Sequence, residues 1–111
     1  MDINYLKECL KRRIELKEMY PILIGRHNFF DKNQAKLNKG IELLDKKAYL
    51  TTNGKAEIYK LGKEFIQIRN EENNFHSSRI RTLYGNVIHD TETELYSVAL
   101  DVFQTYGSDS N

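Results

Sequence analysis

The feature that most constrains the fold is an apolar stripe near the middle of the chain. Ile58, Leu61, Phe65 and Ile68 recur at steps of three and four residues, which is the spacing of one face of an α-helix. A half-buried strand would instead place apolar residues at every second position. The stripe therefore favours a helix over residues 55–69, with one side packed against a core.

The N-terminal half of the sequence predicts two more helices. Residues 3–19 carry an apolar stripe and end just before Pro21, and the residue before a proline disfavours helix. Residues 31–47 carry another stripe and begin with Asp31, a residue type that caps helix N-termini well. The apolar run at 21–25 fits either a buried connecting turn or a lone strand.

The C-terminal half predicts two helices in succession. The first follows a serine cap at Ser77 or Ser78 and carries apolar residues as far as Ile88. The second begins with a cap at Asp90 or Thr91, and the acidic side chains that follow suit the first turn of a helix.

Together these segments predict an all-α fold, a compact bundle of four to five helices in a single domain of residues 1–111. Residues 107–111 are polar and are expected to form a frayed C-terminal tail. One alternative stays open. Asn53-Gly54 is a hairpin signal, so residues 48–61 fit a small β-hairpin as well as a helix.

Composition excludes several classes of protein. Aromatic residues make up 11% of the chain, which argues against disorder. No apolar run is long enough for a membrane span, and the first residues lack the features of a signal peptide. The single cysteine, Cys9, cannot form an internal disulfide. These observations predict a cytoplasmic protein with no membrane association.

Charge is distributed unevenly along the sequence. Residues 1–55 hold 12 basic and 7 acidic side chains, whereas residues 56–111 hold 5 and 9. Such asymmetry can mark a basic face for nucleic acid or for an acidic partner, although lysine-rich helices also simply present solvated faces. The candidate binding residues are five lysines and two tyrosines: Lys32, Lys36, Lys39, Lys46, Lys47, Tyr49 and Tyr59.

Arg69, Asn70 and His76 form the constellation best suited to chemistry. Arg69 and His76 are seven residues apart, so a continuous helix places them at nearly the same angle. The string from Ile68 to His76 resembles the signature of the HEPN ribonucleases, an arginine often followed by a polar residue and then, after four to six residues, by a histidine.

That resemblance implies an all-α bundle that cleaves RNA without a metal, often as a dimer. His76 would then act on a proton at the ribose 2′-hydroxyl or the leaving oxygen, and Arg69 would stabilise charge on the phosphate. The same residues can equally cap a helix end and face solvent.

Two non-enzymatic hypotheses stand beside this one. The first and preferred is a small protein that binds and inhibits or regulates a larger protein partner, such as a bacterial immunity protein, a phage-encoded inhibitor or a regulator subunit. The ribonuclease is the alternative. The third is a winged-helix DNA-binding regulator, in which residues 48–61 supply the wing and the lysines contact phosphates. A homo-oligomer is compatible with each of them.

The sequence alone predicts no metal site and no cofactor. His27, His76 and His89 are far apart in sequence, and one cysteine cannot supply a structural zinc set. The carboxylates at 90–94 are explained by a helix start.

Overall fold

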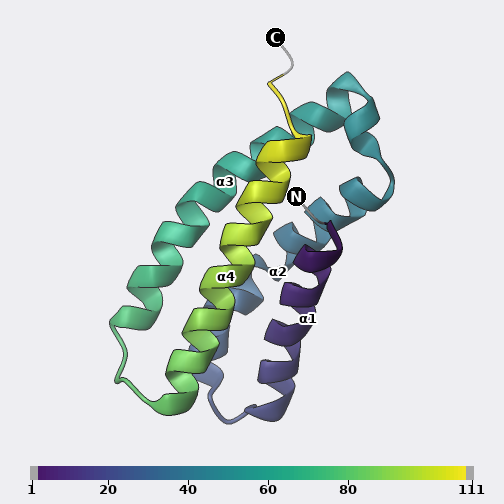
Figure 1. Ribbon diagram of the computed structural model, residues 1–111. Coiled ribbons are helices and arrows are strands. Elements are labelled where there is room, and N and C mark those ends of the chain that lie inside the picture. The colour runs from purple at the N-terminus through teal and green to yellow at the C-terminus, as the bar shows by residue number, and fades with distance from the viewer. Residues whose placement is uncertain (1–2, 110–111) are drawn as a thin grey trace.

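The computed structural model describes residues 3–109 and confirms the all-α prediction. Figure 1 shows an elongated bundle of long helices, with the α1–α2 and α3–α4 connections together at one end. Its elements are α1 (Ile3–Met19), α2 (Ile24–Asp45), a 3₁₀ turn η1 (Ala48–Leu50), α3 (Thr52–Ser77) and α4 (Leu83–Tyr106). No strand occurs among residues 3–109, and none of the helices there is both long and apolar enough to cross a bilayer.

Helix α4 is the central element, because it packs against both α1 and α3. Its apolar face is fully buried at Leu95, Val102 and Phe103. The Phe103 ring lies 5.4 Å from the ring of Phe65 on α3, measured between centroids. Burial of such rings stabilises the fold, since truncating one to alanine costs about 3–5 kcal/mol.

Helix α2 begins at Ile24, seven residues earlier than expected. The prediction of Asp31 as its cap is wrong, because the Asp31 carboxylate lies inside the helix and pairs with Lys17 at 2.6 Å. Leu23 occupies the cap position without a side-chain hydrogen bond. The apolar run at 21–25 is therefore a turn that continues directly into α2, and no lone strand forms there.

The hairpin alternative for residues 48–61 is wrong. After η1, helix α3 starts at Thr52, with the Thr51 side chain accepting a hydrogen bond from the Gly54 amide. Gly54 does not supply a left-handed turn. A Cβ there would lie 1.8 Å from the Ala48 carbonyl oxygen, so this glycine permits the close approach of η1 to α3.

The two C-terminal helices expected from the sequence are one continuous helix, α4. Its cap is Thr82, which accepts a hydrogen bond from the Gly85 amide at 3.0 Å. Caps at Ser77 or Ser78 are wrong, because α3 continues through the polar run and ends there. Caps at Asp90 or Thr91 are wrong as well, since both residues lie inside α4.

The chain that follows α4 returns to α3. The Ser108 amide donates a hydrogen bond to the Lys55 carbonyl at 3.2 Å, so this part of the predicted frayed tail is tied to the bundle. Residues 110–111, like residues 1–2, lie outside the described part of the chain.

Gly40 and Gly25 both lie in α2, and we expect opposite effects from replacing them with alanine. A Cβ on Gly40 would lie 2.2 Å from the Phe103 ring, whereas a Cβ on Gly25 would meet nothing within 4 Å. Gly40→Ala should therefore destabilise the protein by about 1–3 kcal/mol through overpacking. Gly25→Ala should be neutral or stabilise by up to about 1 kcal/mol through helix propensity. Denaturant unfolding of both variants checks this pair, and equal effects would contradict it.

Candidate metal centre

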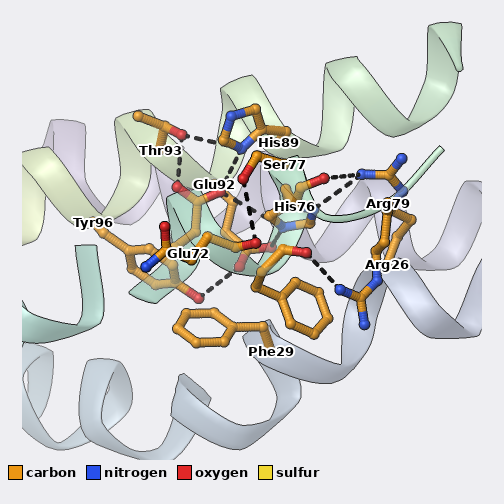
Figure 2. A network of polar contacts seen from close by, with 12 residues as sticks. Arg26, Phe29, Glu72, His76, Ser77, Arg79, His89, Glu92, Thr93 and Tyr96 are labelled. Atoms are coloured by element: carbon orange, nitrogen blue, oxygen red, sulfur yellow. Dashed lines mark hydrogen bonds and ion pairs between the residues drawn. The ribbon is translucent and has the colours of Figure 1, made fainter. Parts of the chain in front are cut away.

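Charged and polar side chains are buried inside the bundle, where they cost free energy unless they are paired or coordinate a metal. Figure 2 shows how several of them converge between α3 and α4. The buried set is Arg13, Arg26, His27, Asn33, Glu72, His76 and Glu92.

The helical spacing of the sequence explains why these side chains meet. On α3, Glu72 and His76 are four residues apart, so both lie on the buried face. On α4, His89 and Thr93 are also four residues apart and face the same point between the helices. The site is therefore built from two matched helical turns.

Glu72 is the centre of the cluster. One of its oxygens, Oε2, lies 2.5 Å from Nδ1 of His89, and the other accepts a hydrogen bond from the Thr93 hydroxyl at 2.7 Å. Burial raises the pKa of the Glu72 carboxyl above its ordinary value. Within residues 3–109, no lysine or arginine forms an ion pair with it.

Glu92, in contrast, is fully paired. Its Oε1 accepts a hydrogen bond from Nε of Arg13 at 2.7 Å, and its Oε2 accepts one from the Tyr96 hydroxyl at 3.1 Å. The side chains of Arg13 and Glu92 are entirely buried, and burial raises the pKa of Tyr96. Arg13 and Glu92 thus form a buried ion pair.

His76 lies between the two carboxylates. Its Nε2 is buried and has no hydrogen-bond partner among residues 3–109. It lies 3.6 Å from Oε2 of Glu72 and 3.5 Å from Oε1 of Glu92, and both distances exceed an ordinary hydrogen bond. On the other side of the ring, Nδ1 faces Nη1 of Arg26 at 3.4 Å.

The donor atoms of Glu72, His76 and His89 fit a metal ion. One ligand atom from each residue lies within 4.8 Å of the others. Ligands at about 2.1 Å from a tetrahedral zinc ion are about 3.4 Å apart, which is close to the 3.6 Å between His76 and Glu72. The 2.5 Å contact between Nδ1 of His89 and Oε2 of Glu72 is a hydrogen bond. A metal bound by both atoms would replace this bond and increase their separation by about 1 Å.

A small pocket opens beside the two imidazoles. It has a volume of about 150 Å³ and is lined by Arg26, His76, Ser77, Arg81, Asn86 and His89. The rings of His76 and His89, whose centroids are 5.1 Å apart, both line it. A ligand in this pocket would therefore reach both imidazoles directly.

The structure separates the residues expected to act in the ribonuclease hypothesis. Arg69 and Asn70 are exposed on α3, whereas His76 is buried. The buried stripe of α3 passes through Ile68 and Glu72 and leaves Arg69 on its solvent side. The guanidinium that lies beside His76 is that of Arg26, which the sequence did not single out.

The candidate binding residues also have definite places. All five lysines named above are exposed on α2 or just after it, while Tyr49 and Tyr59 are half-buried. Lys46 pairs with Glu42 at 3.0 Å. The wing of the winged-helix hypothesis does not form, because residues 48–61 are helical.

Sequence reasoning missed Glu72, His89 and their partners on α4. The available signal was a pair of short motifs, Glu-x-x-x-His at 72–76 and His-x-x-Glu-Thr at 89–93. Each places its polar residues on one helical face. Treating residues 90–94 as a helix start concealed the second motif.

Comparison of the chain with protein-family models, with curated proteins and with solved structures finds no match.

Proposed function

We propose that this protein binds one divalent transition-metal ion through Glu72, His76 and His89 and uses it for hydrolysis. The observation that carries the proposal is the unpaired, buried Nε2 of His76, which points toward the Glu72 carboxylate. Two imidazoles and one carboxylate form a common ligand set of catalytic zinc sites, in which a fourth position stays open for water.

The charges of the cluster support a cation at this point. Glu72, Glu92 and Arg13 have side chains with no exposed surface, and with both carboxyl groups ionised the three carry one uncompensated negative charge. A proton on Glu72 or on an imidazole balances this charge, and so does a bound cation. A metal ion would bind the Glu72 carboxylate and the Nε2 atom of His76 at once.

The surrounding contacts also suit metal ligation. The Thr93 hydroxyl donates to the Glu72 oxygen that does not face the imidazoles, and such contacts orient ligands and tune their affinity. Binding at Nε2 of His76 requires the tautomer that carries its proton on Nδ1, which faces Arg26. The Arg26 guanidinium keeps two backbone acceptors, the carbonyls of His76 and Ile80, so it can release this contact.

A metal ion with an open position lowers the pKa of bound water to about 7 and so supplies hydroxide at neutral pH. The pocket is lined by both of the imidazoles that would hold the ion, His76 and His89.

Zinc titration of the purified, metal-free protein tests the proposal. We expect one zinc ion per chain by competition with a chromophoric chelator, and at least about tenfold weaker binding for Glu72→Gln and for His89→Gln. Glu57→Gln, an exposed position on the same helix, is the matched control. Equal zinc affinity in all four proteins would refute the proposal.

Regulation of a larger protein is a second candidate, and exposed apolar side chains favour it. Ile22, Ile24, Ile80 and Leu83 are 87%, 67%, 85% and 72% exposed. They lie at the end of the bundle that carries the two helix connections (Figure 1), and clustered exposed apolar residues often mark protein contacts.

The regulator hypothesis predicts that one partner protein co-purifies stoichiometrically with the unaltered chain from native cells. The Ile80→Glu variant should no longer retain this partner. Recovery of no such partner with the unaltered chain would count against it.

A further inference from the structure

The pocket beside the proposed metal centre carries an excess of positive charge. Arg26 and Arg81 line it. Burial, and after it the charge of Arg79, lowers the pKa of the Arg26 guanidinium. The two segments that form this end of the bundle, residues 19–30 and 73–89, contain no aspartate or glutamate.

The Arg26 guanidinium has no carboxylate partner among the described residues. Its hydrogen bonds go to the backbone carbonyls of His76 and Ile80, and it also contacts Nδ1 of His76. Gly85 makes room for it, because a Cβ there would lie 2.8 Å from the guanidinium carbon. The chain thus holds a nearly buried arginine at the pocket without neutralising its charge.

Neutral polar side chains complete the lining of the pocket. Asn86 lies in the first turn of α4, where the positive end of the helix dipole also favours an anion. The Ser77 side chain is exposed at the pocket, and its hydroxyl donates to the Asn74 carbonyl, so its oxygen keeps acceptor capacity for a protonated oxyanion.

The volume of the pocket and the charge of its lining favour a phosphate group as the ligand. A cavity of about 150 Å³ has room for about five water molecules, which suits a tetrahedral oxyanion and excludes a large substrate. Two arginines match the dianionic charge and several oxygens of a phosphate, whereas a carboxylate needs only one guanidinium.

We infer that this pocket is the binding site for the phosphate group of a phosphate ester, held by Arg26 and Arg81 beside the metal-binding imidazoles. The inference rests on the proposed function for its chemistry. In hydrolysis, the oxygen of water forms a new bond to phosphorus and the bond from phosphorus to the ester oxygen breaks. One proton of the water ends on the released alcohol, and the other ends on the phosphate.

Calorimetric titration with inorganic phosphate tests the binding site separately from the metal. In metal-free protein kept in chelator, we expect one phosphate per chain, and about tenfold weaker binding for Arg81→Gln, which loses a charge-assisted contact. Arg69→Gln is the matched control, since Arg69 is an exposed arginine of α3 that does not line this pocket. Absence of phosphate binding, or equal losses in both variants, overturns the inference.

Hydrolysis of 4-nitrophenyl phosphate then tests the substrate class. We expect zinc-dependent release of 4-nitrophenolate that falls about tenfold in Arg81→Gln and is unchanged in Arg69→Gln. Phosphate binding without hydrolysis by zinc-loaded protein overturns the ester assignment. Failure of zinc to bind while phosphate still binds refutes the proposed function and leaves only an anion site, so the two failures are distinguishable.

Discussion

Arg13→Met is expected to lower the free energy of unfolding by about 3–5 kcal/mol, because it leaves the Glu92 carboxylate buried without its partner. For a chain of 111 residues, this corresponds to a fall in Tm of about 15 °C. The guanidinium also lies 4.7 Å above the Phe30 ring, so the substitution removes a cation–π contact as well. Urea unfolding and differential scanning calorimetry measure the loss.

Two further variants show whether the buried charge is responsible for that loss. Arg12→Met removes the next residue, an exposed arginine that pairs with Glu94 at 3.3 Å, and should cost less than about 1 kcal/mol. The double variant Arg13→Met/Glu92→Gln should recover part of the loss, because no unpaired charge remains. A single Arg13 variant no less stable than the Arg12 variant would contradict this account of the interior.

We expect zinc to stabilise the unaltered protein much more than Glu72→Gln. A cluster with a purely structural role would not produce this difference. At a free zinc concentration of about 100 times Kd, the unaltered protein should gain about 2.7 kcal/mol, or about 10 °C in Tm. Glu72→Gln should be more stable than the unaltered protein without metal, because it removes a buried carboxylate that lacks a cationic partner. At the same zinc concentration it should gain at most about 1.4 kcal/mol, because its binding is at least about tenfold weaker.

The control for this comparison is Glu57→Gln, which should match the unaltered protein with and without zinc because its side chain is exposed. If Glu72→Gln destabilises the metal-free protein strongly, Glu72 serves the fold. If its Tm rises with zinc as much as that of the unaltered chain, Glu72 is not a ligand.

Helix periodicity was sufficient to predict the fold class, because each long helix carries an apolar stripe that must face a core. It was insufficient for the ends of the helices. Asp31 has the chemistry of a cap, but its partner Lys17 lies on another helix. Gly54 has the chemistry of a turn, but its purpose is contact with the Ala48 carbonyl. In both cases a contact between different elements determines the role of the residue, and such contacts cannot be read from the local sequence pattern.

The site was less predictable than the fold. The sequence indicates His76 as a candidate residue because of its spacing from Arg69. In the structure the two side chains do not meet, since Arg69 is exposed and His76 is buried. Its neighbours include Arg26 from α2 and two residues of α4, His89 and Glu92. Periodicity indicates which side of each helix faces inward, but it does not indicate which inward residues meet. The tertiary arrangement was needed for that.

A crystal structure of the zinc-loaded protein, with anomalous diffraction recorded on both sides of the zinc absorption edge, tests the central claim most directly. We expect one anomalous peak about 2.0–2.2 Å from Nε2 of His76, Nδ1 of His89 and an oxygen of Glu72. Peaks confined to exposed histidine or carboxylate side chains, with Nε2 of His76 still unligated, would contradict the claim.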